Sequence, residues 1–264
     1  MPGKLAVLDG VVMDVADAQI SVTDEGLLRG DGVFEVIRLY AGRPFGMQEH
    51  LDRMANSAES LRLPFDADLV RADAEALLDS NGEEDGMLRL VVTRGGRRIG
   101  IVERLPAFPE TIALQTITYS PTRVLDGVKS LSYGGNMLAS RLAREQGADD
   151  ALLVSPHGRV LEGPTTSFFY ALDGALYTPP LSDRILDSIT RRALLEVTDA
   201  SERVTTRDDL SLISEAFLAS SLREVQPVRS IDGAAVPEAP GPLSASAATA
   251  VHEHIEAALS HAAG

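Results

Sequence analysis

Residues 30–61 read GDGVFEVIRLYAGRPFGMQEHLDRMANSAESL and combine a strand pattern with a helix pattern. Its first part holds two apolar runs on either side of Ala41-Gly42, a pattern typical of a β-hairpin. Its second part places apolar residues at steps of three and four, at Met47, Leu51, Met54, Ala58 and Leu61. Such a period is typical of an amphipathic helix. The stretch therefore predicts an α+β unit.

The sequence on both sides of this stretch continues the same alternation. KLAVLDGVVM places Asp9-Gly10 between two short apolar runs, which is the signal of a type I′ hairpin. Residues 66–82 have the period of a second helix, and residues 86–96 and 111–121 read as strands. We therefore expect an N-terminal α+β domain over residues 1–118, followed by an interdomain linker at 119–125.

The second half predicts another α+β domain, over residues 126–264. Helices are expected from about Asn136, over 188–200 and, after a proline-rich spacer, over 244–262. The expected strands, separated by turn signals such as His157-Gly158 and Asp173-Gly174, are 150–156, 159–163, 166–174, 175–180 and 215–221. The fold class that fits is α+β with two domains, mainly antiparallel sheets and flanking helices.

Composition excludes several classes of function. The formal net charge of −15 argues against nucleic acid and anionic membrane as partners, because both require a basic surface. The absence of cysteine excludes disulfides, thiol nucleophiles and thiolate metal sites, and the histidine spacing predicts no metal site. With no signal peptide and no apolar run of membrane-spanning length, a cytoplasmic protein is expected.

Residues 127–136, GVKSLSYGGN, contain one of only two lysines among the chain's 24 basic residues. Arginine does not readily deprotonate, so a chain that uses few lysines must keep lysine where an amine nucleophile is needed. Lys129 lies next to Val128 and two residues before Leu131. Burial lowers the pKa of a lysine and makes its neutral amine available for a Schiff base. An ordinary surface lysine is the alternative interpretation.

Other residues could complete a cofactor site. Glu162 ends an apolar run, and a carboxylate there could hold a protonated ring nitrogen, although the local sequence alone favours a solvated turn glutamate. A phosphate could be bound by Arg53, by the helix start at Asp187–Thr190, and by hydroxyls at Ser220 and Ser221. These residues are also compatible with a surface arginine, a helix cap and turn serines.

The loop TRGGRRIG, residues 93–100, places Arg94, Arg97 and Arg98 together in an otherwise acidic chain. Such a cluster could bind the carboxylate of a substrate, because guanidinium groups pair with carboxylates in a fixed geometry. A solvated basic loop remains the alternative.

The order of these motifs resembles the class IV enzymes that use pyridoxal 5'-phosphate (PLP), over roughly residues 20–232. The resemblance is carried by residues 30–61, by residues 127–197 and by FLASSLREVQPV at 217–228. That family contains D-amino acid transaminases, branched-chain transaminases and aminodeoxychorismate lyases. The resemblance implies the two-domain architecture of fold type IV, with the site between the domains and a homodimer as the assembly.

The resemblance also implies roles for individual residues. Lys129 is similar to the lysine that forms the Schiff base with PLP and then moves a proton between the substrate and the cofactor. Glu162 resembles the carboxylate that keeps the pyridine nitrogen protonated. The phosphate-binding set implied by the resemblance is Arg53, the backbone at Ile189 and Thr190, and Ser221. Tyr133 falls where the family often has a side chain near the cofactor.

The branch of the family is less closely specified. The strand MLRLVVTRGG lacks the YxRP pattern common in branched-chain transaminases and is closer to the D-amino acid transaminase and lyase branches. The candidate ligands for the substrate carboxylate are Arg97 and Arg98, whose loop lacks a histidine, with Arg29 as an alternative. Phe34 occupies a position where D-amino acid transaminases often have a tyrosine. Val36 replaces the threonine that is frequent in the lyases.

We therefore expect a transaminase that moves an amino group from a D-amino acid to an α-keto acid, with simple (R)-amines as further donors. The first alternative is an aminodeoxychorismate lyase that releases pyruvate and 4-aminobenzoate, and the second is a branched-chain transaminase. A catalytically silent PLP-binding relative is the alternative outside enzymes. The presence of both Lys129 and Glu162 argues against it. A protein that only binds PLP needs neither a lysine for catalysis nor a carboxylate that keeps the ring nitrogen protonated.

Overall fold

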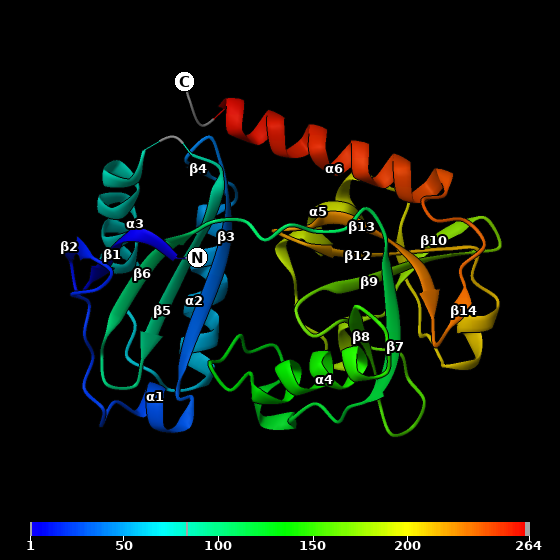
Figure 1. The fold of residues 1–264 in the computed structure, drawn as a ribbon, viewed down its shortest axis with the longest axis horizontal. Helices are drawn as coiled ribbons and strands as arrows, with labels where there is room; N and C mark the ends of the chain where they lie inside the picture. The colour runs from blue at the N-terminus through cyan, green and yellow to red at the C-terminus, as the bar shows by residue number, and fades with distance from the viewer. Residues whose placement is uncertain (1, 83, 262–264) are drawn as a thin grey trace. The chain divides into compact units, whose positions relative to one another are not determined.

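The computed structural model describes residues 2–82 and 84–261, which form two compact units (Figure 1). The first unit contains the chain up to Ala107 together with Val128–Tyr133, and the second contains Phe108–Gly127 and the chain from Gly134 onward. The expected division at residues 119–125 does not coincide with these units, because strand β7 (Ile112–Thr118) pairs within the second sheet. In the described chain, no helix is long and apolar enough to cross a membrane.

The first unit is built on an antiparallel sheet. Its strands run in the order β2-β1-β6-β5-β3-β4, and every neighbouring pair is antiparallel. Their bounds are β1 Pro2–Leu8, β2 Val11–Asp14, β3 Gly32–Tyr40, β4 Arg43–Pro44, β5 Gly86–Thr93 and β6 Arg98–Glu103. This arrangement agrees with the predicted α+β class and its mainly antiparallel pairing.

The two hairpins predicted from the sequence are confirmed by the backbone of their turns. Asp9 and Gly10 have φ angles of 51° and 90°, and Ala41 and Gly42 have φ angles of 48° and 76°. Positive φ at both central residues is the geometry of a type I′ turn, whose twist matches that of paired strands. Alanine is unfavourable in this conformation, and Asp85 Oδ1 holds it there by accepting a hydrogen bond of 2.8 Å from Ala41 N.

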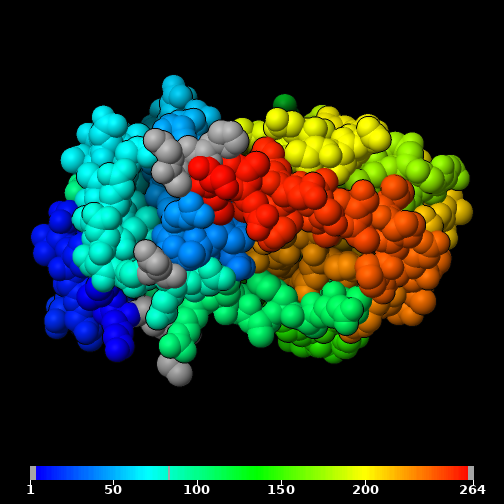
Figure 2. Space-filling view, turned by 90° about the horizontal axis from the view of Figure 1, so that it is seen from above, coloured from blue at the N-terminus to red at the C-terminus, as the bar shows by residue number. Residues whose placement is uncertain are grey.

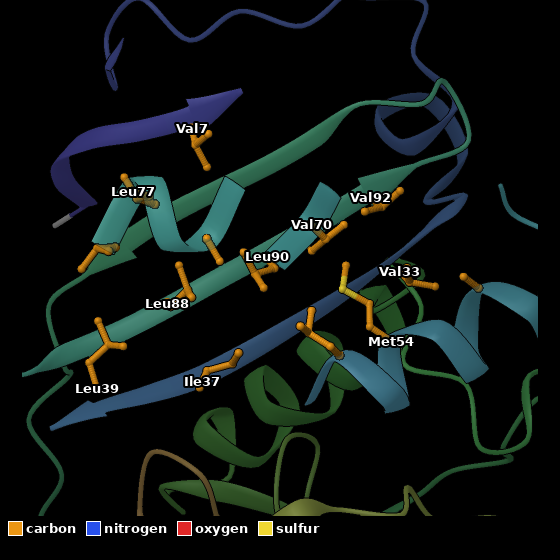
Figure 3. Close-up of a cluster of buried hydrophobic side chains, with 14 of the residues drawn as sticks. Val7, Val33, Ile37, Leu39, Met54, Val70, Leu77, Leu88, Leu90 and Val92 are labelled. Carbon is orange, nitrogen blue, oxygen red and sulfur yellow. The ribbon is translucent and has the colours of Figure 1, made fainter. Parts of the chain in front are cut away.

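Two amphipathic helices bury their apolar sides on one face of this sheet. They are α2 (Met47–Ser60) and α3 (Ala67–Asn81), and a short α1 (Glu25–Arg29) precedes β3. Figure 3 shows Met54 from α2 and Val70 and Leu77 from α3 directed at strand residues that include Ile37 and Leu88. The predicted helical period of residues 47–61 is therefore confirmed, and it positions the buried face of α2 on β3.

The second unit is built on a mixed sheet that is mainly antiparallel. Its strand order is β11-β10-β9-β12-β13-β7-β8, with β14 beside β13, and the parallel pairs are β10–β11, β13–β7 and β7–β8. The remaining bounds are β8 Asp150–Val154, β9 Ser167–Leu172, β10 Ala175–Thr178, β11 Ser201–Glu202, β12 Glu215–Ser220, β13 Glu224–Ile231 and β14 Ala234–Ala235. The expected strand at 159–163 forms only isolated bridges, for example between Val154 and Val160.

Three α-helices accompany the described part of this sheet. They are α4 (Gly134–Glu145), which joins β7 to β8, α5 (Ile189–Val197) and α6 (Pro242–His261). α5 packs against α6 and β12, and Figure 2 shows α6 on the surface of the second unit. Short 3₁₀ turns lie at Arg123–Leu125, Leu181–Asp183 and Asp208–Ser211. A buried cluster that includes Phe168, Tyr170 and Leu218 forms one core of this unit.

Candidate active site

The segment that carries Lys129 runs beside the beginning of β3. Phe34 N donates a hydrogen bond of 3.2 Å to Lys129 O, and Leu131 N donates one of 2.8 Å to Gly32 O. On the other side, Lys129 N donates to Ser57 Oγ of α2 at 3.1 Å. These contacts explain why residues 128–133 belong to the first unit although they follow β7. They fix the backbone from which the Lys129 amine extends.

The amine of Lys129 lies against two aromatic rings. Its Nζ is 4.3 Å from the centroid of the Phe34 ring and 5.4 Å from the centroid of the Tyr133 ring. The two rings meet edge to face, with their centroids 5.0 Å apart and their planes at 89°. Phe34, Lys129 and Tyr133 therefore lie together, with Nζ beside two aromatic rings.

Arg53 is held rigidly by a glutamate that sequence reasoning did not select. Its Nε donates to Glu35 Oε1 and its Nη2 to Glu35 Oε2, both at 2.7 Å. His50 Nδ1 lies 2.7 Å from Glu35 Oε2 and donates to it. Glu35 and His50 are fully buried, and the Arg53 side chain is 10% exposed. A two-point contact of this kind sets the plane of the guanidinium.

The protonation states of this triad follow from its surroundings. Burial raises the pKa of Glu35, but the charge and hydrogen bonds of Arg53, with the hydrogen bond from His50, outweigh it and lower that pKa to about 2. Burial lowers the pKa of His50, and this effect is larger than the opposing effect of Glu35, so the pKa lies below its ordinary value. The positive charges of Arg53 and Lys129 act in the same direction as burial. Glu35 is thus ionised and His50 neutral at pH 7.

Glu162 belongs to the second unit, in the irregular segment after β8. Its backbone oxygen accepts from Leu153 N at 2.8 Å, and its Oε1 accepts from Leu186 N at 3.1 Å. Burial raises the pKa of Tyr119, and the nearby Glu162 carboxylate raises it further. Glu162 is therefore an anchored carboxylate, connected to the segment that leads into α5.

Two elements that the sequence predicted to bind a phosphate lie in the same unit as Glu162. At the start of α5, Ser188 is the N-cap and its Oγ accepts from Arg191 N at 3.4 Å, so Ile189 and Thr190 form the first turn. Amide groups in a first helical turn favour a bound anion. Ser221 directly follows β12, against which α5 packs. Both features are where the sequence placed them.

The structure does not bring all the candidate carboxylate ligands to Lys129. Arg98 pairs in register with Val92, which in turn pairs with Val33, and both valines face the helix-covered core. The Nε of Arg98 donates to Asp73 of α3 at 2.8 Å. Phe34 projects from the opposite face of the sheet, because adjacent residues of a strand alternate in direction.

Arg97 and Arg29 are more accessible than Arg98. Arg97 pairs with Asp9 in the turn between β1 and β2, and its side chain is 43% exposed. Arg29 ends α1, 74% exposed, with its Nε 3.2 Å from Glu25 Oε2. The loop after β5 is joined to α1, since Thr93 Oγ1 donates to Asp24 Oδ2 at 2.9 Å.

The sequence held one signal for the missed triad. Every second residue of β3, at positions 33, 35, 37 and 39, faces the core of the first unit, and Glu35 is the charged member of that set. A carboxylate at a core position of a strand requires a buried partner. His50 and Ser57 carried no comparable signal, because both fit the polar positions of a helix that was expected to be half exposed.

Comparison with known proteins relates this arrangement to one family. The model of the family Amino-transferase class IV matches residues 32–231. A putative branched-chain-amino-acid aminotransferase from Methanocaldococcus jannaschii is 36% identical over 86% of this chain and 87% of its own length. A D-alanine aminotransferase from Bacillus licheniformis is 32% identical over 94% of this chain and 96% of its own.

A solved structure extends the likeness to the fold. It is the PLP-bound form of a hypothetical aminotransferase from Mycobacterium tuberculosis, with a TM-score of 0.88 and 29% identity. The match covers 96% of this chain and 99% of the other. The predicted fold type is therefore confirmed.

Proposed function

The chain belongs to the class IV aminotransferases, and we propose that it is a transaminase whose amino donor is a D-amino acid. PLP is the cofactor of this family. When bound, it draws electrons from the Cα of the donor, so that the Cα proton can leave. The residues present fit that group: the chain offers an amine for its aldehyde, a carboxylate for its ring nitrogen, and a cation and helix-terminal amides for its phosphate.

The observation that carries the proposal is the pairing of a fixed amine with a fixed cation in the first unit. Lys129 is anchored through its backbone to both β3 and α2, and Arg53 of α2 is held through Glu35. An amine that attacks an aldehyde and a guanidinium that binds a phosphate must keep a constant separation. Here the same two elements, β3 and α2, hold both groups.

We assign the roles in the first unit as follows. Lys129 Nζ binds the cofactor and accepts the proton that leaves the donor Cα. Phe34 and Tyr133 exclude water from one side of Nζ, which restricts proton exchange with solvent. Arg53 binds the cofactor phosphate.

In the second unit, Glu162 holds the proton on the ring nitrogen of the cofactor, and the amide of Leu186 keeps the carboxylate oriented. The amides of Ile189 and Thr190 and the hydroxyl of Ser221 bind the phosphate. A cytoplasmic homodimer with small amino and keto acids as substrates fits this assignment.

The donor is proposed to be a D-amino acid for two reasons. The chain lacks the YxRP pattern of branched-chain transaminases, and a D-alanine aminotransferase is similar to it over nearly its whole length. Arg97 or Arg29 would bind the donor carboxylate. Arg98 is not proposed for this role, because Asp73 holds it on the helix-covered face.

A branched-chain transaminase is the second candidate. It is favoured by the 36% identity to the putative branched-chain enzyme and by the apolar Phe34 ring beside Lys129 Nζ, which suits an aliphatic side chain. The two candidates differ in donor and not in chemistry.

A substrate panel tests the proposal. The PLP-loaded protein is given D-alanine, L-leucine, (R)-1-phenylethylamine or aminodeoxychorismate, each with and without 2-oxoglutarate, and the carbonyl product is measured. We expect the highest kcat/KM with D-alanine, and pyruvate release that stops at about one per cofactor when 2-oxoglutarate is left out.

Each other result has a defined meaning. If L-leucine is turned over and D-alanine is not, the branched-chain candidate replaces the proposal. Continuous pyruvate release from aminodeoxychorismate without a keto acid would indicate a lyase. A protein that binds PLP but gives no spectral change with any donor would be a silent relative.

A further inference from the structure

The turn between β12 and β13 carries an arginine that the proposed reaction leaves unused. Ser220 pairs with Glu224 across this hairpin, so Ser221, Leu222 and Arg223 make the turn. Glu224 closes it with a φ of 54°, in the left-handed region that residues other than glycine rarely adopt. A turn with this geometry requires contacts that hold it in place.

Arg223 supplies those contacts from within the turn. Its backbone N donates to Ser220 Oγ at 3.2 Å. Its Nη1 donates to Gln226 Oε1 at 2.5 Å, and its Nη2 donates to Asp150 Oδ2 at 3.1 Å. Its guanidinium also lies over the Phe108 ring, 5.0 Å from the centroid.

The partners of Arg223 are themselves fixed. Asp150 is 3% exposed and begins β8, and its Oδ1 accepts from Ser140 Oγ of α4 at 2.8 Å. Gln226 is equally buried, and its Nε2 donates to Pro109 O at 2.8 Å. The guanidinium therefore fastens the turn to a buried polar network that spans β8, β13, α4 and the segment before β7.

We propose that Arg223 is a positioning residue for phosphate binding: it holds the turn 221–223 so that Ser221 is preorganised toward the cofactor phosphate. This inference rests on the proposed function, in which Ser221 binds that phosphate. The guanidinium is directed into the network around Asp150 and Gln226, so it acts through Ser221 and not on the phosphate itself. Preorganisation lowers the entropic cost of binding.

The test compares the affinity of the cofactor-free, full-length protein for PLP and for pyridoxal, which lacks the phosphate. Arg223→Met removes the charge while keeping much of the length of the side chain. We expect it to raise the Kd for PLP about tenfold, the loss expected for one weakened charge-assisted hydrogen bond, and to leave the Kd for pyridoxal unchanged.

Arg229→Met is the matched control. Arg229 lies on β13, outside the turn; its Nη2 is 2.8 Å from Oδ2 of Asp149, the neighbour of Asp150, and its side chain is 46% exposed. We expect it to change neither dissociation constant. Arg223→Lys keeps the charge but cannot contact both partners in the same geometry. Its ratio of the Kd for PLP to the Kd for pyridoxal should lie between those of the wild type and Arg223→Met.

The possible outcomes separate the two levels of the proposal. Equal losses for PLP and pyridoxal in both Arg223 variants, or no loss in either, would overturn the positioning role. If Arg223→Met does not fold, the ratio measured on Arg223→Lys decides. A wild-type protein that binds PLP no better than pyridoxal would overturn the phosphate site itself, and with it the proposed function.

Discussion

At the scale of single residues, the buried triad of Glu35, His50 and Arg53 is the least expected feature of the molecule. A charged carboxylate in the core is costly unless it is fully paired, and here Arg53 and His50 supply both charge and donors. Because the pKa of Glu35 is lowered to about 2, its contribution to stability is complete above its ordinary pKa of 4.5 and is lost as pH falls toward 2.

His50 gives this triad a measurable pH dependence in a milder range. Its pKa is lowered from 6.5, so below that pH the unfolded chain binds a proton that the folded chain does not. The free energy of unfolding must therefore decrease as pH falls below 6.5, by up to about 1.4 kcal/mol per pH unit for this group. Urea unfolding at pH 7.5 and 5.5 should show a larger loss for the wild type than for His50→Asn, whose amide can still donate to Glu35.

His157→Asn is the control for this measurement, because His157 lies in an exposed turn. It should retain the pH dependence of the wild type. An unchanged pH dependence in His50→Asn would mean that His50 is not buried as a neutral ring.

At the residue scale, sequence reasoning depended on side chains with distinctive chemistry, and the role that it gave Lys129 stays a prediction. The scarcity of lysine and the position of Lys129 indicated the amine. Arg98 was interpreted as a substrate ligand because its partner, Asp73, lies 25 positions away in the chain. A sequence pattern shows a cluster of cations but not the carboxylates that the fold brings to it.

At the scale of elements, α6 shows how a helix end can depend on a strand. Glu215 of β12 accepts from Leu243 N at 3.0 Å and from Ser244 N at 2.8 Å, so its carboxylate caps the start of α6. Gly241 leaves room for that carboxylate, since a Cβ there would lie 2.1 Å from Glu215 Cδ. The other end of β12 carries the turn with Ser221.

We therefore expect Gly241→Ala to displace the Glu215 carboxylate and to lower the free energy of unfolding by about 2 kcal/mol. Urea unfolding measures the change. Gly134→Ala is the matched control, because a Cβ at Gly134 meets nothing within 4 Å. If the two variants unfold at the same urea concentration, Glu215 is not the cap that holds α6.

Elements were predicted well where the signal is local. The period of apolar residues gave α2 and α3, and turn residues gave the β1–β2 and β3–β4 hairpins. The run at 159–163 was read as a strand because its composition is apolar, yet it pairs only through isolated bridges. Strand order and the parallel pairs of β7 were beyond such patterns, because they depend on contacts between distant segments.

At the scale of the whole molecule, the chain passes between its two units after Ala107, after Gly127 and after Tyr133. The brief return at Val128–Tyr133 carries Lys129 to β3 of the first unit, whereas Glu162, α5 and Ser221 stay in the second. The sequence predicted two α+β units but assigned Lys129 to the second. The hydrogen bonds that hold Lys129 to β3 and α2 join segments far apart in the chain, so no local pattern showed them. Each unit thus contributes part of the proposed cofactor set.

The proposed function depends first on Lys129 as the amine that binds the cofactor. Borohydride reduction of the PLP-loaded protein, followed by proteolysis and mass spectrometry, tests it most directly, because reduction makes the attachment permanent. We expect a single pyridoxyl group on the peptide that contains Lys129, and none after the protein has been converted with D-alanine before reduction. A pyridoxyl group on Lys4, or an unmodified Lys129 in protein that has bound PLP, would contradict it.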